Sequence, residues 1–266
     1  MAIGLSTYAF FWRGASSASK PMSLEQMLEE TAEPGGGVFQ ICDYPAVEQL
    51  STARLAALSL RAAELGVALE LGTRGLGREN LTRYLDIADR LDVRLVRSML
   101  YSGDDRPARD EAVKRIAALL PRLEQQGVTL ALETYEQVPL ETLMAVVETL
   151  DHERVGVCLD PGNCVAALEM PGDVIKRTAS RVVNLHLKDF AFRRSPGWVG
   201  FELTGAALGE GLLPLSSMMS RVAPHQRGIN CVLEHWLSWQ QDEATTHAME
   251  ARWTRHGMAT FKERTW

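Results

Sequence analysis

The 266-residue sequence has no block rich in lysine and arginine, and its formal net charge at pH 7 is −6. Nucleic acids are bound largely through clustered basic residues that contact phosphates, so this composition argues against a nucleic-acid partner. No apolar run reaches the length of a membrane-spanning helix. The N-terminus lacks a basic segment and a small-residue cleavage site, so we expect no signal peptide, no membrane partner and a cytoplasmic location.

Cysteine is also scarce. Four cysteines are present, spaced too widely for a CxxC metal-binding knuckle: Cys42, Cys158, Cys164 and Cys231. Most of them fall in or near apolar runs, which is typical of buried free thiols in a reducing compartment. Linkers, low-complexity segments and shifts in composition are absent as well. Residues 1–266 are therefore predicted to form a single domain.

What the sequence does contain is an eightfold alternation of short apolar runs and longer amphipathic stretches. The runs predict strands at residues 2–9, 37–42, 67–71, 94–100, 128–133, 155–160, 182–187 and 230–235. The stretches predict helices near 23–32, 46–65, 79–91, 108–126, 140–150, 172–179, 215–223 and 242–262. Eight βα units in a chain of this length indicate an α/β fold, namely a (β/α)₈ barrel of the TIM type.

Four residues that can bind metal stand at the ends of the last four predicted strands: Glu133, Asp160, His186 and Glu234. In such barrels the carboxyl ends of the strands converge at one mouth, where function resides. A single residue of this kind is more often a helix cap, a surface charge or a structural histidine. Four together would repel one another without a cation, so they predict a divalent-metal site. Oxygen-rich ligation favours Mn²⁺, with Mg²⁺ or Co²⁺ as alternatives.

These motifs resemble a known family. Glu133, Asp160 followed by Pro-Gly-Asn163, His186 in His-Leu-Lys-Asp and Glu234 are similar to the strand ends of the xylose-isomerase-like TIM barrels. Among these, the sugar phosphate isomerase/epimerase branch, with its ketose 3-epimerases, is most similar. The resemblance implies that the four residues bind one metal ion and that Glu133 and Glu234 form an acid/base pair on opposite faces of a ketose. Either glutamate could instead be a purely structural ligand.

The resemblance implies an isomerase or epimerase that acts on a small sugar or sugar acid through a metal-stabilised cis-enediolate. Asn163 departs from the ketose 3-epimerases, which usually carry a histidine at that position and a glutamate further beyond the fifth strand than Glu136. The alternative is a lyase, a decarboxylase or dehydratase of a 3-oxo-sugar acid that forms the same metal-bound enolate. A non-catalytic sugar-binding barrel is a third hypothesis, against which the complete ligand set argues.

Further residues near the strand ends are expected to bind substrate: Arg97, Asn163, Lys188, Arg193, Glu70 and Trp236. Arg97 is either an anion clamp or a partner of a ligand carboxylate, and Arg193 is either a substrate contact or an exposed loop charge. Pairing of Glu70 with Arg97 or Arg74 would be a structural use of that glutamate. Glycines and aromatics at 195–211, after the seventh strand, suggest a lid-like loop or a plain covering loop. We expect a homodimer or homotetramer.

Overall fold

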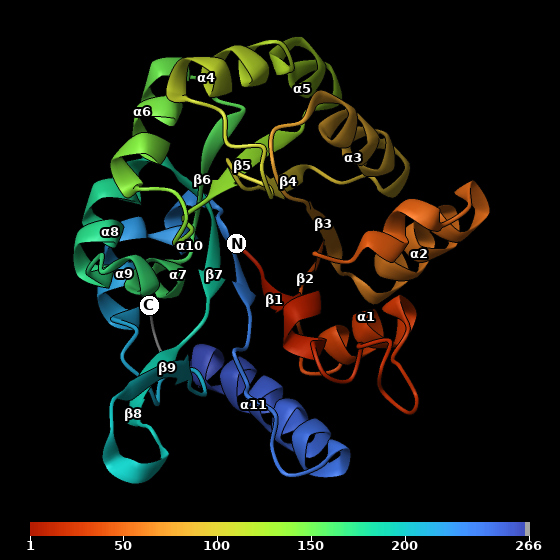
Figure 1. The fold of residues 1–266 in the computed structure, drawn as a ribbon. Helices are drawn as coiled ribbons and strands as arrows, with labels where there is room; N and C mark the ends of the chain where they lie inside the picture. Colours follow the sequence, from red (N-terminus) through yellow and green to blue (C-terminus); the bar gives the residue numbers. More distant parts are fainter. Residues whose placement is uncertain (264–266) are drawn as a thin grey trace.

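The apolar runs form parallel strands that close into a barrel, seen in the computed structural model of the protein, which describes residues 1–263 (Figure 1). The order around the barrel is β1-β10-β7-β6-β5-β4-β3-β2, so the first strand pairs with the last. The expected single-domain TIM barrel is thereby confirmed. Residues 264–266 of the predicted domain lie outside the described part. The barrel strands are β1 (Ile3–Ser6), β2 (Val38–Cys42), β3 (Ala68–Gly72), β4 (Leu95–Ser98), β5 (Thr129–Glu133), β6 (Val155–Leu159), β7 (Val182–Leu187) and β10 (Asn230–Leu233).

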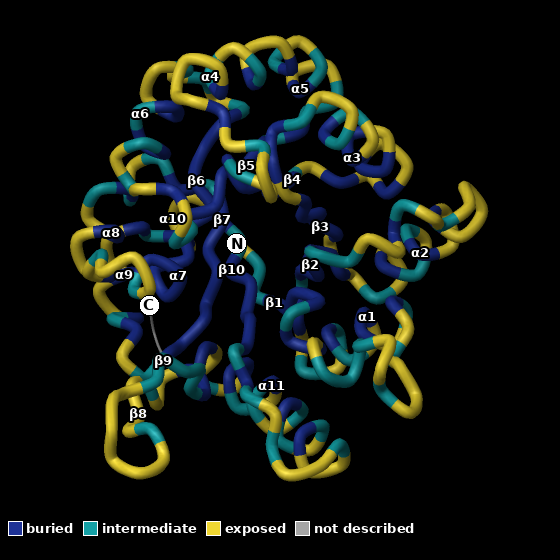
Figure 2. The backbone as a smooth tube through the Cα atoms, in the orientation of Figure 1, coloured by how far each residue is buried: buried dark blue, intermediate teal, exposed yellow. Residues whose placement is uncertain are grey.

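Helices surround the barrel, and the longer ones bury an apolar face against it while their outer faces remain exposed (Figure 2). Their order follows the alternation in the sequence. The helices are α1 (Leu24–Ala32), α2 (Thr52–Leu65), α3 (Arg78–Leu91), α4 (Arg109–Ala117), α5 (Leu120–Gln126), α6 (Leu140–Leu150), α7 (Pro161–Cys164), α8 (Pro171–Thr178), α9 (Leu215–Val222), α10 (Pro224–Arg227) and α11 (Glu243–Glu263). No helix in residues 1–263 combines the length and low polarity needed to cross a bilayer.

Local signals account for several boundaries. Ser23 and Gln26 form a capping box at the start of α1, and Gly66 ends α2 in the left-handed conformation with a φ of 67°. The first strand is shorter than predicted because the Ser6 side chain accepts a hydrogen bond from Tyr8 N and caps a 3₁₀ turn. The helix predicted at 108–126 is two helices, since Pro121 lies in the first turn of α5 and has no N–H to continue α4.

The segment after β7 differs most from the expectation. Much of it is an antiparallel hairpin of β8 (Phe190–Arg194) and β9 (Phe201–Gly205), not a loop. Figure 1 shows this hairpin projecting beyond the ring of helices. Its tip exposes 79% of Trp198 and 83% of Val199. Pairing across the hairpin was missed because glycine and proline at the tip interrupt the alternating pattern of its strands. Closure of this segment over the mouth stays a prediction.

Candidate metal centre

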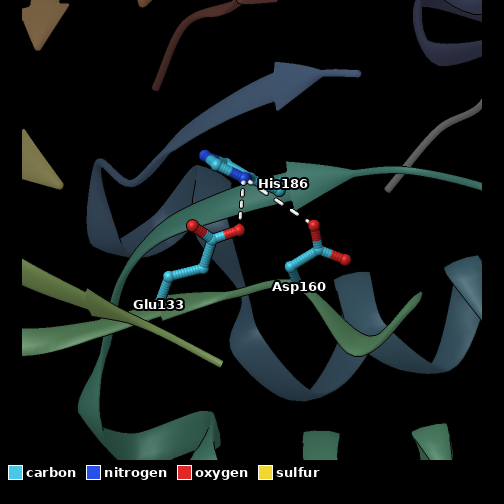
Figure 3. A group of neighbouring side chains, drawn as sticks. All are labelled: Glu133, Asp160 and His186. Carbon is cyan, nitrogen blue, oxygen red and sulfur yellow. Dashed lines mark ion pairs between the residues drawn. The ribbon is translucent and has the colours of Figure 1, made fainter. Parts of the chain in front are cut away.

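Three predicted ligands meet at the carboxyl ends of neighbouring strands. Glu133 is the last residue of β5, Asp160 directly follows β6, and His186 lies near the end of β7. Their ligand atoms lie within 4.8 Å of one another. His186 Nδ1 is 3.4 Å from Glu133 Oε1 and 3.8 Å from Asp160 Oδ2 (Figure 3). All three side chains are buried, with at most 2% of their surface exposed.

The fourth predicted ligand approaches the same imidazole nitrogen from β10. Glu234 directly follows that strand, and its Oε1 lies 3.4 Å from His186 Nδ1. Ser6, the last residue of β1, donates a 2.9 Å hydrogen bond to the same oxygen. Burial by itself would raise the pKa of Glu234, but the positive charges of His186, Lys188 and Arg97 lower it well below its usual value. Glu234 is thus an ionised carboxylate directed at the triad.

Buried polar atoms without a hydrogen bond test whether this arrangement fits a cation. Glu133 Oε2, Asp160 Oδ2 and His186 Nδ1 make no hydrogen bond within the described residues, although the two oxygens form ion pairs with Arg97 Nε at 2.8 Å and Lys188 Nζ at 2.6 Å. Such atoms are rare in folded proteins and call for a ligand or another explanation. Carboxylate oxygens with one imidazole nitrogen are a donor set that suits Mn²⁺, Mg²⁺ or Co²⁺. The residues therefore fit a divalent cation.

Lys188, two residues after His186, lies close to the ligand set. Its Nζ lies 2.6 Å from Asp160 Oδ2 and 3.0 Å from Glu234 Oε2. Burial would lower the pKa of Lys188, but Asp160 and Glu234 raise it well above its usual value. The ammonium lies 4.9 Å from the ring centre of Trp236 and 5.8 Å from that of Tyr8. Lys188 is therefore a protonated donor between two aromatic walls.

Arg97 is buried, and its guanidinium is directed at the protein's own groups. Its Nε lies 2.8 Å from Glu133 Oε2, an ion pair without hydrogen-bond geometry. Its Nη2 and Nη1 donate to Asp43 Oδ2 at 3.2 Å and to Thr73 O at 3.1 Å. Of the two roles considered for Arg97, these contacts favour that of a partner to a ligand carboxylate.

Asn163 supports one of the predicted ligands. Its Nδ2 donates to Glu133 Oε1 at 3.0 Å and to Thr134 O at 3.2 Å, so it orients that carboxylate. Both Asn163 and Trp236 line the cavity at the barrel mouth, whose volume is about 320 Å³.

Two predicted substrate residues are not brought to this cavity. Arg193 lies on the hairpin, 57% exposed, and pairs with Glu202 at 3.1 Å. Glu70 lies deeper in the barrel, and its partners are amide side chains rather than Arg97 or Arg74. The predicted strand ended one residue too early, so Glu70 was placed closer to the mouth than it is.

Asp43 and Arg74, which were not predicted as site residues, are among the other residues that line the cavity, as is Tyr8. Asp43 directly follows β2, so the strand-end rule could have identified it. Its φ is 49°, a backbone conformation that is uncommon outside glycine. Asp43 Oδ1 accepts from Arg74 Nε at 2.7 Å while Oδ2 accepts from Arg97, so one carboxylate joins two arginines. Burial would raise the pKa of Asp43, but these arginines lower it.

The chain belongs to the xylose isomerase-like TIM barrel family, whose model matches residues 29–263. Its fold is similar to that of a D-psicose 3-epimerase from Clostridium cellulolyticum H10, with a TM-score of 0.74, 17% identity and 99% of each chain covered. It is also similar to a xylose isomerase-like TIM barrel protein from Mycobacterium smegmatis, solved in complex with magnesium, with a TM-score of 0.70, 18% identity and 97% of each chain covered. At these identities the likeness shows the fold alone.

A curated relative bears on function. The 3-oxo-isoapionate decarboxylase of Pectobacterium atrosepticum is 55% identical over 258 residues, covering 97% of this chain and 94% of the relative. A decarboxylase is a lyase. The expected isomerase or epimerase is therefore wrong, and the alternative from the sequence, a lyase of a 3-oxo-sugar acid, is the better supported of the two. The error arose because the strand-end residues indicate a metal site but do not determine which reaction takes place there.

Proposed function

We propose that the protein is a metal-dependent decarboxylase that releases CO₂ from a 3-oxo sugar acid of the 3-oxo-isoapionate type. The observation that carries the proposal is the 55% identity to such a decarboxylase across 97% of the chain. The site supports it with an oxygen-rich ligand set in a cavity sized for a small molecule. We expect Mn²⁺, with Mg²⁺ or Co²⁺ as alternatives.

Decarboxylation of a 3-oxo acid breaks the C1–C2 bond and leaves the electron pair on C2, delocalised onto the 3-oxo oxygen. A divalent cation bound by the strand-end ligands would supply positive charge to that oxygen. The product then needs one proton at C2 and no base. Glu133 and Glu234 are therefore assigned as ligands only, and the acid/base pair expected for epimerisation is not needed.

Lys188 is our candidate for the proton donor. Its ammonium lies beside Asp160 and Glu234 and is held protonated by them. Transfer of a proton from Nζ to C2 would complete the product, and water would return the proton to the amine. The rings of Trp236 and Tyr8 flank this ammonium and provide an apolar wall for the departing, uncharged CO₂.

Arg74 is our candidate for holding the substrate carboxylate. It lines the cavity with 47% of its side chain exposed, and its Nη1 has no partner among the described residues. Arg97 and Lys188, by contrast, already contact two carboxylates each. Since the carboxylate loses its charge as CO₂ forms, a very strong contact would stabilise the ground state and slow the reaction. Sharing Arg74 with Asp43 limits that effect.

Incubation of the purified protein with Mn²⁺ and 3-oxo-isoapionate tests the proposal. We expect release of one CO₂ per substrate and, in D₂O, one deuterium at the carbon that carried the carboxyl group. Asp160→Asn is the control, because it removes a ligand charge and should abolish turnover. Absence of CO₂ release from a protein that binds Mn²⁺ would contradict the proposal.

Cytoplasmic location and assembly as a homodimer or homotetramer remain predictions. The four cysteines are free and buried, which agrees with a reducing, cytoplasmic location. Size-exclusion chromatography with light scattering would measure the assembly.

A further inference from the structure

Beneath the metal-binding residues, Glu70 is surrounded by amide side chains inside the barrel. It is 3% exposed, and both of its oxygens accept hydrogen bonds. Asn230 Nδ2 donates to Oε1 at 2.8 Å, while Gln40 Nε2 and Asn184 Nδ2 each donate to Oε2 at 3.0 Å. Gln40 neighbours Glu70 in register, and Asn184 neighbours Asn230, so adjacent strands form one layer of side chains.

The hydrogen-bond directions in this layer are fixed by groups that can only donate or only accept. The backbone N–H of Ala2 donates to Asn230 Oδ1 at 2.9 Å, so the amide nitrogen of Asn230 must face Glu70. An ionised carboxylate can only accept. Glu70 therefore turns the amide nitrogens of Gln40 and Asn184 toward itself. Asn184 Oδ1 in turn accepts from Gln40 Nε2 at 3.1 Å, which fixes the Gln40 amide a second time.

The orientation of the Gln40 amide determines which ring nitrogen of His186 carries a proton. Because Nε2 of Gln40 faces Glu70, its carbonyl Oε1 faces His186 Nε2, at 2.9 Å. A carbonyl only accepts, so His186 must carry a proton on Nε2. Any second proton lies on Nδ1, the nitrogen 3.4 to 3.8 Å from the three carboxylates, and a cation bound there would take its place. A reversed Gln40 amide would force the proton onto Nδ1 and block the cation.

We propose that Glu70 is a positioning residue that, acting through Gln40, selects the His186 tautomer able to bind the metal ion. Glu70 does not line the cavity at the barrel mouth, and its hydrogen bonds go to amide side chains and not to a metal ligand. Its role is to hold one amide in one orientation. This inference concerns the organisation of the metal site and does not depend on the substrate.

Titration of Mn²⁺ into the chelator-treated protein, followed by electron paramagnetic resonance, tests the inference in the Glu70→Gln variant. Glutamine is close to glutamate in shape but places an N–H₂ group among donors, so one neighbouring amide must reverse. Loss of a residue that orients a metal ligand typically weakens affinity about 10–100-fold, and we expect a loss in that range. Wild-type affinity in Glu70→Gln would overturn the inference.

The matched control is Glu250→Gln in α11. Glu250 is also a fully buried carboxylate, and it accepts from Trp12 N at 2.8 Å, Arg13 N at 3.2 Å and Arg13 Nε at 2.9 Å. None of these groups contacts the metal-binding residues. We expect Mn²⁺ affinity within about twofold of wild type for this variant. An equal loss in both variants would reduce the effect to general destabilisation and overturn the specific role of Glu70.

Exchanging the carboxylate of Glu70 with the amide of Gln40 should restore Mn²⁺ binding. In the double variant Gln40→Glu/Glu70→Gln, the carboxylate at position 40 again accepts from His186 Nε2 and the amide at position 70 can donate to it. We expect Mn²⁺ affinity to recover by about tenfold over Glu70→Gln. No recovery in a folded double variant would contradict the inference. If Glu70→Gln does not fold, Gln40→Met carries the test, and unchanged affinity there would also overturn it.

A direct readout is the ¹⁵N spectrum of the histidines in the Zn²⁺-loaded wild type, with the His186 signals assigned by their loss in His186→Asn. A proton on Nε2 supports the inference, and a proton on Nδ1 overturns it. Failure of the wild type to bind any divalent cation would overturn the metal centre itself. Absence of decarboxylation with normal cation affinity would overturn only the proposed function.

Discussion

Two polar clusters lie one above the other inside the barrel, and they are satisfied in different ways. The upper cluster, at the mouth, consists of charged side chains, and three of its buried atoms have no hydrogen-bond partner among the described residues: Glu133 Oε2, Asp160 Oδ2 and His186 Nδ1. The lower cluster, at the floor, surrounds one carboxylate with neutral amides. Within residues 1–263, none of the side-chain polar atoms of Glu70, Gln40, Asn184 or Asn230 is buried without a partner.

The two clusters also differ in the pKa values of their glutamates, Glu70 at the floor and Glu234 at the mouth. Burial raises the pKa of Glu70, and its hydrogen bonds to Asn230, Gln40 and Asn184 only partly offset this. Burial acts on Glu234 in the same direction, but the surrounding cations reverse it and lower the pKa. Two equally buried carboxyl groups therefore have pKa values shifted in opposite directions, because one has neutral neighbours and the other has cationic ones. The floor is complete as built, whereas the mouth is arranged to receive a further charged group.

The largest effect is expected from His186→Asn, which removes the imidazole from the mouth. Loss of the metal ion's contribution, several kcal/mol, should lower kcat/KM about 10³-fold or more. The measurement is CO₂ release with circular dichroism to confirm folding. His235→Asn is the matched control, since burial lowers the pKa of His235 to about 4 and its Nε2 pairs with Thr254 Oγ1 at 3.2 Å, away from the ligands. A comparable loss of kcat/KM in both variants would contradict a specific role of His186 in metal binding.

Next in size is Arg74→Met. A hydrogen bond to a charged group contributes about 1.5–3 kcal/mol, so we expect KM to rise about 10–150-fold with kcat changed much less. Initial rates across a range of 3-oxo-isoapionate concentrations separate the two parameters. Arg193→Met serves as the control because Arg193 pairs with Glu202 on the hairpin. A fall in kcat at unchanged KM would exclude Arg74 as the carboxylate holder.

The opposed pKa shifts predict opposite pH dependences of stability. The pKa of folded Glu70 is raised above 4.5, so its contribution is most favourable at low pH and declines as pH rises through the folded pKa. The pKa of folded Glu234 is lowered, so its contribution is present above about pH 4.5 and is lost as pH falls below that value. A difference of one in pKa corresponds to about 1.4 kcal/mol, or about 3–6 °C in Tm.

Thermal melts in the presence of a chelator measure this contrast. The Tm of wild type minus that of Glu70→Gln should decrease with rising pH, while the corresponding difference for Glu234→Gln should increase between about pH 3 and 5. If the Tm differences of the two variants changed with pH in the same direction, the opposite pKa shifts of Glu70 and Glu234 would be contradicted.

The smallest effect is expected at the hairpin. Trp198 contacts Arg194, whose guanidinium carbon lies 5.3 Å from the ring centre, and is largely exposed. Trp198→Ser should therefore change kcat/KM less than about twofold, as is usual for exposed positions. Trp236→Ala, in the cavity wall beside Lys188, should lower it much more. A tenfold loss in Trp198→Ser would instead support closure of the hairpin over the mouth.

The barrel and its metal-binding residues could be predicted from the sequence because they depend on local patterns. Apolar runs define strands, and ligand-type residues at their ends must converge once the barrel closes. Glu70 shows where this fails. Side chains alternate along β3, so Glu70 and Gly72 both point inward, and Gly72 occupies the layer nearer the mouth. A shift of one residue in a strand boundary therefore moves a side chain from the mouth to the floor.

Other features depend on contacts between segments distant in sequence. Asp43 joins Arg74 and Arg97, which lie 31 and 54 residues away. A methyl group on Gly72 would lie 2.4 Å from Cys42 Cβ and 3.5 Å from Arg97 Cζ, so this glycine leaves space for the buried guanidinium. No single stretch of sequence encodes these packings. The outcome of the reaction was equally hidden, because the strand-end residues indicate a metal site and not the bond that the enzyme breaks.

The pairing of the first strand with the last has a consequence for biosynthesis. Ser6, at the end of β1, contacts Glu234, at the end of β10, across 228 residues of chain. At about 5–20 residues per second, a ribosome needs on the order of 10–50 s to synthesise the intervening chain. During that interval β1 exposes an unpaired edge, and the nascent protein has neither a closed barrel nor a complete ligand set. The metal centre can therefore form only near the end of translation, or after release.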